Sequence, residues 1–431
     1  MEEDGVVKSR IASHNRLGII IFLAVLVLGL VGCGIPSQPG QSGNGAAPVS
    51  EGAESREETI RIGLVTTLTG PGAVQGIPLK RGAEVAIKHI NEQGGVLGKK
   101  LELIIRDDEY DASKAVTAVQ ELVTRRHIVA IIGPSGSSSA LSSVDVLREA
   151  KIPVMAIAST SKLSTAELPG MFRIFPRDDY YATPIATYMA RHFQKPALAY
   201  VDDALGKSQR EQMEKYWREH GINPVAIVAF DKSEKDFTGV VQQLRASGAD
   251  AVYVSGASPM IANIITTAKR LGYRPQFFGA ISIAVMDFRQ LAREDSNGVM
   301  FPYFPYPFDP RLQGNPDLPR IEWNMSEIAK NFYETWKTDY EHRKIEYSGR
   351  TIYEIPSHDQ FAYDAVRIIA EAINKAGTTD PTTLVKTIED IGKFSYLGRY
   401  EFSPADHEGL AIEDMRLGRI KDGILEFNIE W

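Results

Sequence analysis

Short apolar runs alternate with amphipathic stretches along most of this chain, and this alternation restricts its possible folds more than any other feature. Residues 60–66 form an apolar run typical of a buried strand, and residues 79–91, which follow, carry apolar side chains at helical spacing. Strands that alternate with helices in this way form parallel βαβ units with right-handed crossovers. The sequence therefore predicts an α/β fold built on parallel sheets.

The alternation continues through both halves of the chain. In the first half we expect strands at residues 101–106, 129–132 and 152–156, a helix at 112–125, and a loop at 67–76. In the second half the pattern predicts strands at 197–201, 225–230, 251–254, 276–279, 397–402 and within 412–429, and helices at 208–220, 237–247, 259–271, 328–340, 360–376 and 381–390. Because 431 residues are too many for one ordinary domain, we expect two doubly wound units.

The stretch at residues 301–308 (FPYFPYPF) interrupts this pattern with three prolines among aromatic residues. Proline has no backbone N–H to donate, so alternating prolines are incompatible with a central strand. We predict an extended crossover at this point.

The N-terminal segment, residues 1–33, has the organisation of a targeting sequence. Lys8, Arg10 and Arg16 are followed by an apolar run at 17–31, which is short for a membrane-spanning helix. The run leads to Cys33 in a sequence that resembles the bacterial lipoprotein box, where cleavage leaves a lipid-modified cysteine at the new N-terminus. An uncleaved anchor helix is the alternative, and both interpretations place the body outside the cytoplasm.

The segment that follows, residues 34–58, is rich in Gly, Ser and Pro and has almost nothing to bury, so we expect a flexible tether. The whole chain is 43% hydrophobic and carries a net charge of −7, which argues for a soluble body and against a nucleic-acid partner. Cys33 is the only cysteine, so neither an internal disulfide nor a cysteine-based metal site is expected.

A serine-rich turn follows the predicted strand at 129–132. Gly133, Pro134 and Gly136 end the strand, and residues 137–139, all serine, lead into a helical segment. Serine caps the free N–H groups at the start of a helix, and these groups attract anions together with the helix dipole. Open α/β sheets bind ligands at this end of their strands. We therefore interpret the turn as a seat for a small carboxylate, with a well-capped βα turn as the alternative.

The sequence contains no recognisable set of catalytic residues. Its eight histidines lack a zinc-binding spacing, no dinucleotide-binding glycine motif follows the first strand, and no phosphate-binding P-loop is present. Residues 133–137 approach the G-x-S-x-G pattern of serine hydrolases, but serine replaces the last glycine. We expect no cofactor and no metal, and a secreted hydrolase that uses Ser135 or Ser137 is the least favoured alternative.

Several short motifs occur in a characteristic order. They are Ile62-Gly63-Leu64, Thr69-Gly70-Pro71, Gly82-Ala83-Glu84, Ile90-Asn91, Gly94-Gly95, Gly98-Lys99-Lys100-Leu101, Asp107-Asp108, Ile132-Gly133 and Lys235-Asp236-Phe237. In this order, and over roughly residues 60–427, the chain resembles the leucine/isoleucine/valine-binding family of ABC-transporter substrate-binding proteins. Each motif is weak alone, and it is their succession that makes the resemblance specific.

The resemblance implies the type I periplasmic binding fold, in which two Rossmann-like lobes are joined by three crossovers. Placed on this sequence, lobe 1 spans residues 59–175 and 303–396, and lobe 2 spans 176–302 and 397–431. The ligand is then expected in the cleft between the lobes, which close over it by a hinge motion.

The resemblance also implies binding residues. Ser137 matches the serine whose hydroxyl and amide hold the ligand carboxylate, and Ser138 lies beside it. Ala158 matches the alanine whose carbonyl accepts a hydrogen bond from the ligand ammonium group, and Thr160 matches a threonine that contributes a hydroxyl and an amide. An ordinary turn closed by its own side chain is the alternative for Thr160.

Four positions depart from the family pattern. Aromatic residues of the relatives fall on Gln75, Leu205 and Ala257, and the smaller side chains of Leu205 and Ala257 would leave room for a bulkier or aromatic organic acid. The acid that pairs with the ligand ammonium group falls on Ile281. Because an unpaired buried ammonium is costly, either the ligand lacks this group or Asp203 (or the aspartate before it) replaces the missing acid. A solvated turn is the alternative for these aspartates, and leucine is not the favoured ligand.

The sequence therefore predicts the extracytoplasmic solute-binding component of an ABC importer. It would bind a small carboxylate, an amino acid or a related organic acid, and deliver it to a membrane permease. We expect a monomer anchored to the membrane through the lipid on Cys33. A sensor that reports ligand occupancy to a membrane receptor is the main alternative.

Overall fold

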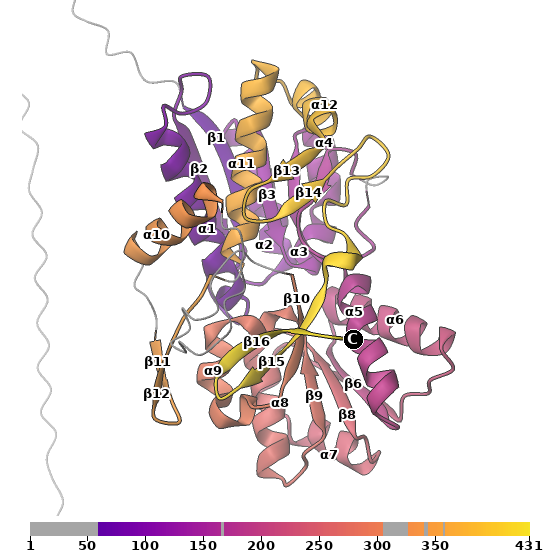
Figure 1. Cartoon of the computed structure of the whole chain (residues 1–431). Coiled ribbons are helices and arrows are strands. Elements are labelled where there is room, and N and C mark those ends of the chain that lie inside the picture. The colour runs from indigo at the N-terminus through magenta and orange to yellow at the C-terminus, as the bar shows by residue number, and fades with distance from the viewer. Residues whose placement is uncertain (1–58, 165–167, 305–325, 340–343, 357) are drawn as a thin grey trace, which may run out of the picture. The chain divides into compact units, whose positions relative to one another are not determined.

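A computed structural model describes residues 59–164, 168–304, 326–339, 344–356 and 358–431 of the protein. All of these residues belong to one compact unit, in which two sheets form the centres of two lobes (Figure 1). The expected signal segment, Cys33 and the tether lie outside the described residues. Within the described ranges, no helix is both long enough and apolar enough to cross a membrane.

The first sheet has five strands, each parallel to its neighbours. Their order is β2 (Leu101–Asp107), β1 (Ile60–Thr66), β3 (Ala130–Ser135), β4 (Val154–Ile157) and β5 (Met171–Arg173). Because side chains alternate between the faces of a strand, Ile62 and Leu64 enter one core and Val65 enters another. The first core is covered by α1 (Ala73–Glu92), α10 (Glu327–Asp339), α11 (Asp359–Ala376) and α12 (Pro381–Ile391), and the second by α2 (Ala112–Arg125), α3 (Ser137–Ser142) and α4 (Val144–Ala150).

The second sheet has seven strands. Their order is β16 (Ile424–Ile429), β15 (Arg416–Lys421), β10 (Met300–Tyr303), β9 (Gln276–Gly279), β8 (Ala251–Ser255), β6 (Pro196–Val201) and β7 (Ala226–Phe230). The strands from β10 to β7 are parallel, whereas β15 and β16 are antiparallel. One face packs on α7 (Thr238–Ala246), α8 (Ser258–Arg270) and α9 (Met286–Ala292), and the other on α5 (Asp178–His192) and α6 (Ala204–Glu219).

Two small antiparallel pairs complete the body. β11 (Lys344–Tyr347) pairs with β12 (Arg350–Tyr353), and this hairpin packs on Met286 of the second lobe. β13 (Lys393–Ser395) pairs with β14 (Arg399–Glu401). The sequence pattern did not predict the β11–β12 hairpin, and it also missed α5, α9, β5 and β13.

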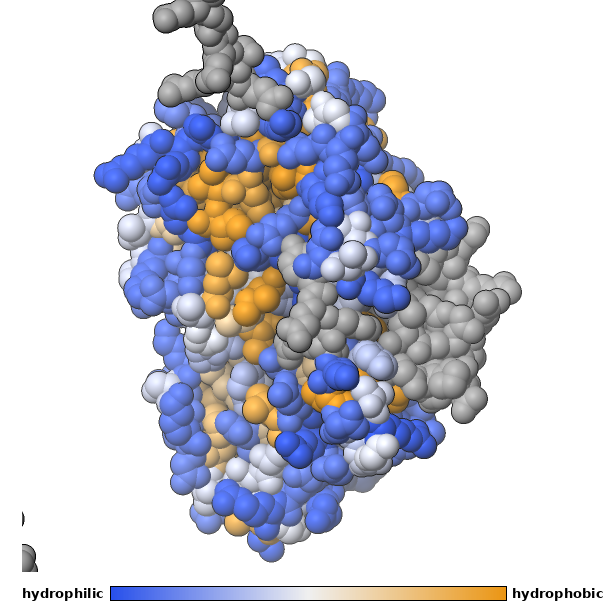
Figure 2. Space-filling view, turned by 90° about the vertical axis from the view of Figure 1, so that its left-hand side faces the viewer, coloured by the Kyte–Doolittle hydropathy of each residue, from blue (hydrophilic) through white to orange (hydrophobic). Residues whose placement is uncertain are grey.

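The edge strand β2 is partly exposed along all but its first residue. Figure 2 looks onto the side of the body that carries β2 in Figure 1 and shows apolar residues among hydrophilic ones on this face. Charged residues such as Glu102 and Arg106 interrupt the apolar sequence of the strand and pair with Arg61 and Glu121. Charges of this kind discourage pairing of an exposed edge with another chain.

The predicted α/β class with two parallel-sheet lobes is confirmed, but two local predictions are wrong. Helix α1 begins at Ala73, inside the segment predicted as a loop, and it contains Pro78 in its second turn. Strand β10 includes the first residues of the crossover predicted at 301–308 and lies between two neighbours although it contains Pro302, while residues 305–308 lie outside the described residues. Its single register pair with β9 joins Met300 to Phe278, before the proline, so no N–H of residue 302 is needed on that side.

Core packing suggests a different end for the first lobe. Leu397, Tyr400, Leu410 and Met415 belong to the core of the first sheet, and the chain enters the second sheet again only at β15. We therefore propose that the last return to lobe 2 occurs near residue 416 rather than at residue 397. Strand β10 keeps the chain in lobe 2 through residue 303, next to the crossover expected there.

Candidate functional site

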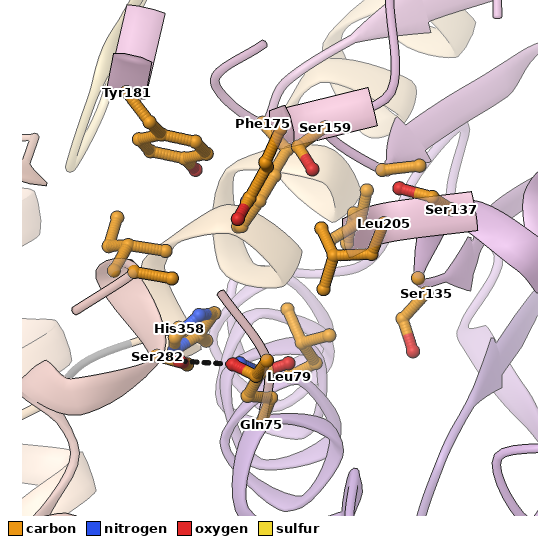
Figure 3. Close-up of a pocket in the computed structure, with 17 residues that line it drawn as sticks. Gln75, Leu79, Ser135, Ser137, Ser159, Phe175, Tyr181, Leu205, Ser282 and His358 are labelled. Carbon is orange, nitrogen blue, oxygen red and sulfur yellow. Dashed lines mark hydrogen bonds between the residues drawn. The ribbon is translucent and has the colours of Figure 1, made fainter. Parts of the chain in front are cut away.

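Two adjoining cavities lie where elements of both sheets meet. The first has a volume of about 510 Å³ and the second of about 570 Å³, each counted with the solvent-filled space at its mouth. Residues that line both cavities are Gln75, Ser135, Gly136, Ser137 and Leu205. Because they share this wall, we treat the cavities as two chambers of one cleft. Figure 3 shows the residues of the first chamber.

Ser137 stands at the junction of the chambers. It follows Gly136, whose φ of 90° turns the backbone from β3 into α3. Its side chain is 2% exposed, and its hydroxyl oxygen has no hydrogen-bond partner among the described residues. A buried hydroxyl without a partner costs about 1–3 kcal/mol, so this hydroxyl is well suited to bind a ligand.

The other serines of this turn have different partners. Ser135 shares a hydrogen bond of 2.8 Å with Thr66, and Ser139 donates one of 2.8 Å to Asp108. Ser138 accepts a hydrogen bond of 3.4 Å from the backbone N–H of Ala204 in the other lobe. The expected serine cap of the helix is absent, because α3 begins after a glycine and receives no side-chain cap.

Ala158 lines the first chamber, but its carbonyl oxygen already accepts a hydrogen bond from Arg173. Thr160 is buried and lines neither chamber. Its hydroxyl accepts a hydrogen bond of 3.3 Å from the backbone N–H of Lys162, two residues further on. This is the geometry of the turn named as its alternative role.

The remaining predicted residues all reach the cleft. Gln75 and Leu205 line both chambers, Ile281 lines the first, and Ala257 and Asp203 line the second together with Ser138. The structure therefore brings every predicted ligand-binding residue except Thr160 to one place.

Aromatic rings line the first chamber from positions that sequence reasoning missed. Phe175 lies at the end of the first segment of lobe 1, Tyr181 lies on α5, and His358 precedes α11 (Figure 3). Phe175 stacks on His358 with ring centroids 5.9 Å apart and an interplanar angle of 25°. No local sequence signal marks these residues, because they lie far in sequence from the serine-rich turn and reach the cleft only in the folded chain.

Charge is distributed unevenly between the chambers. No Asp, Glu, Lys or Arg is among the described residues that line the first chamber, whereas Asp203 and Lys232 line the second. Asp203 accepts hydrogen bonds from the hydroxyl of Tyr110 at 3.3 Å and from the N–H of Gly206 at 3.0 Å. Burial raises the pKa of Asp203, and these hydrogen bonds oppose the rise.

A second carboxylate, Asp178, lies behind the wall of the first chamber. Its side chain is fully buried, and neither oxygen has a hydrogen bond of ordinary geometry to another described residue. Burial raises the pKa of Asp178 to about 6, while nearby Ser208, Ser159 and Gln209 oppose the rise. Ser159 and Gln209 also line the chamber, so they connect this carboxylate to the cavity wall.

The lobes contact each other beside the cleft. Lys162 of the first lobe forms a salt bridge of 3.0 Å with Glu211 on α6, and Gln212 donates a hydrogen bond of 3.1 Å to Ser161. Together with the contact between Ser138 and Ala204, these pairs hold α6 against the first lobe. The structure therefore has its lobes closed over the cleft.

The site does not have the geometry of a serine hydrolase. A nucleophilic serine needs an adjacent general base. Ser137 has none within hydrogen-bond distance among the described residues, and Ser135 is bonded to a threonine hydroxyl. Among the described residues, no group of three or more His, Cys, Asp or Glu side chains is placed to hold a metal ion.

Two lobes that close over a cleft, with a free hydroxyl inside it, define the class: a protein that binds a small molecule between its lobes. Comparison with protein families agrees, because the model described as "Periplasmic binding protein" matches residues 59–424. The chain belongs to this family, whose members are binding proteins and not enzymes.

Relatives of known name and structure support this assignment. "Leu/Ile/Val-binding protein homolog 1" of Brucella melitensis is 26% identical over 352 residues, which cover 81% of this chain and 87% of the relative. "Amino acid binding protein" of Pseudomonas aeruginosa is 27% identical over 80% of this chain and 86% of the relative. The type 1 periplasmic binding protein of Bordetella pertussis has the same fold, with a TM-score of 0.74 at 23% identity over 86% of this chain and all of that one.

Proposed function

We propose that this protein binds a small carboxylate in the cleft and delivers it to an ABC permease as the substrate-binding component of an importer. The observation that carries the proposal is the buried, unpartnered hydroxyl of Ser137, at the carboxyl end of β3 and on the wall shared by both chambers. Ligands of parallel α/β sheets bind at this end of the strands. The backbone N–H groups at the start of α3, which receive no side-chain cap, are available to the same carboxylate.

Relatives such as the Brucella protein are named for binding leucine, isoleucine and valine, so these amino acids are the ligands against which others are compared. The streptococcal substrate-binding protein crystallised with isoleucine has the same fold, with a TM-score of 0.71 at 20% identity over 87% of this chain and all of that one. The family resemblance puts the acid that pairs with the ammonium group at the position of Ile281, and this isoleucine lies in the cavity wall. We therefore propose that acids without an amino group bind more tightly than the corresponding amino acids.

A thermal-shift screen tests this proposal, because a ligand that binds the folded state raises the melting temperature by mass action. The informative comparison is leucine and valine against 4-methylpentanoate and 3-methylbutanoate, with 3-methylbutan-1-amine as a control that lacks the carboxylate. We expect shifts with the acids, smaller shifts with the amino acids and none with the amine.

Two results would contradict the proposal. No change in melting temperature with any carboxylate would rule out carboxylates as the ligand class. A larger shift with the amino acids would show that the ammonium group is bound, and Asp178 or Asp203 would then be the counter-charge to mutate first.

Membrane attachment through Cys33, delivery to a permease and a monomeric state are parts of the same proposal. Sensing through a membrane receptor uses the same fold and remains the second candidate. Neighbouring genes for permeases and ATPases would favour transport, whereas a neighbouring receptor kinase would favour sensing.

A further inference from the structure

His358 is held in place by its neighbours in the chain. Arg81 on α1 bonds to Asp359 on one side of it, with Nε 2.6 Å from Oδ1 and Nη2 3.2 Å from Oδ2. The same guanidinium lies 3.5 Å from a carboxylate oxygen of Glu354, on the other side. Trp336 donates a further hydrogen bond of 3.0 Å to Asp359. This buried cluster therefore fixes both ends of the short segment that carries His358.

The imidazole of His358 is buried in the wall of the first chamber and has no hydrogen-bond partner in the part of the chain that the structure describes. Its side chain is 1% exposed, and neither ring nitrogen has a hydrogen bond to a described residue. The imidazole packs against the aromatic rings of Phe175 and Phe361, and these contacts provide no hydrogen bond. Because buried polar groups are nearly always bonded, this ring is expected to find its partner inside the chamber.

The ring offers two different hydrogen bonds. Burial lowers the pKa of His358 to about 4, so the ring is neutral near pH 7, with one nitrogen as donor and the other as acceptor. The first chamber is lined by no Asp, Glu, Lys or Arg among the described residues. A neutral group that can both donate and accept, such as a hydroxyl or a carboxamide, therefore matches the ring better than an aliphatic or a charged group.

Figure 3 places Ser137 and His358 on opposite sides of the chamber. A ligand whose carboxylate lies at Ser137 would extend its side chain towards His358. We propose that His358 determines specificity by bonding a neutral hydroxyl or carboxamide at the end of the ligand side chain. This inference rests on the proposed function, because it takes the carboxylate at Ser137 as the fixed end of the ligand.

Calorimetry of the intact protein with isosteric ligand pairs tests the inference. In each pair a hydrogen-bonding group replaces an aliphatic group of the same shape: threonine against valine, asparagine against leucine, 3-hydroxybutanoate against 3-methylbutanoate, and succinamate against 4-methylpentanoate. We expect the polar member of at least one pair to bind tenfold or more tightly, because a site with buried polar groups rejects an analogue that leaves them unpaired.

Two variants connect this preference to His358. His358→Phe keeps an aromatic ring between its neighbours but removes both hydrogen bonds, and we expect it to abolish the tenfold ratio. His358→Gln keeps a donor and an acceptor, and we expect it to retain most of the ratio. Thermal unfolding of both variants checks that they are folded.

The outcomes separate the two proposals. Two results would overturn the role of His358 and leave the proposed function standing. One is tighter binding of the aliphatic ligand in every pair. The other is an unchanged affinity ratio between polar and aliphatic ligands in folded His358→Phe. Binding of no member of any pair would overturn both.

Discussion

At the scale of single residues, two polar side chains on opposite sides of the first chamber lack a hydrogen-bond partner among the described residues, and the proposed specificity rests on them. Ser137 has a buried hydroxyl at a strand end, and His358 has a buried neutral ring on the opposite wall. The side chains between them are mainly apolar or neutral. Such a cleft excludes water and leaves orientation to a few polar groups, which is typical of small-molecule sites.

The first prediction at this scale concerns Ser137. Ser137→Ala removes a hydrogen bond to a charged group, so carboxylate affinity should fall by about 1.5–3 kcal/mol in calorimetry. Ser142→Ala is a matched control on the same helix, because the Ser142 hydroxyl bonds only to the carbonyl of Ser138. Equal affinity of the wild type and Ser137→Ala would show that the carboxylate lies elsewhere.

The second prediction concerns the pH dependence of stability. The pKa of His358 lies near 4 in the folded protein, below its ordinary value of 6.5. Between pH 4 and pH 6.5 the unfolded chain therefore binds more protons than the folded protein. The free energy of unfolding falls as the pH drops from 6.5 towards 4, because the buried ring must stay neutral in the folded state. The loss amounts to about 3 kcal/mol for this shift. Urea denaturation between pH 4 and pH 6.5 should show that the free energy of unfolding of His358→Phe depends less on pH than that of the wild type. Parallel pH profiles of the two proteins would contradict the lowered pKa of His358.

At the scale of secondary-structure elements, the position of α3 depends on a contact to the end of β2. Ser139 donates to Asp108, which also accepts from the hydroxyl of Thr67, so one buried carboxylate joins a helix and two strand ends. This contact determines where the first turn of α3, and with it Ser137, faces the cleft.

Ser139→Ala should therefore lower the free energy of unfolding by about 1.5–3 kcal/mol, because it leaves a buried carboxylate oxygen without its donor. Urea denaturation measures the change, and Ser142→Ala should stay within about 0.5 kcal/mol of the wild type, as expected for an exposed substitution. A change in Ser139→Ala no larger than in this control would mean that α3 is held by its apolar contacts alone.

At the scale of the whole molecule, closure of the lobes is supported by polar pairs at the rim of the cleft. The salt bridge between Lys162 and Glu211 is exposed on both sides, so its contribution to closure is small and sensitive to salt. Reversal of one charge replaces this attraction with repulsion across the closed interface.

We expect Lys162→Glu to weaken ligand affinity about two- to fivefold at low salt, with a smaller effect at high salt. The double variant Lys162→Glu/Glu211→Lys restores opposite charges and should recover the wild-type affinity in the same calorimetric measurement. Failure of the double variant to recover affinity would mean that the pair does not contribute to closure.

The sequence by itself determined the fold class and one wall of the cleft. Apolar periodicity predicted the parallel strands, because each must fill a core on both faces, and the glycines and serines after β3 marked the strand end where Ser137 lies. The resemblance to known binding proteins, and not the local pattern, predicted that Gln75, Leu205, Ala257 and Ile281 lie in the cleft, and they line it.

Tertiary structure alone decided the opposite wall and the state of each polar group. His358 lines the first chamber and Asp178 lies behind its wall, and neither residue carries a local motif, because both are far in sequence from the serine-rich turn. The sequence offered no sign that Arg173 already occupies the carbonyl of Ala158, and for Thr160 it left the self-closed turn as one of two open interpretations. Hydrogen-bond partners and burial depend on contacts between distant segments, so only the folded chain determines which polar groups remain available to a ligand.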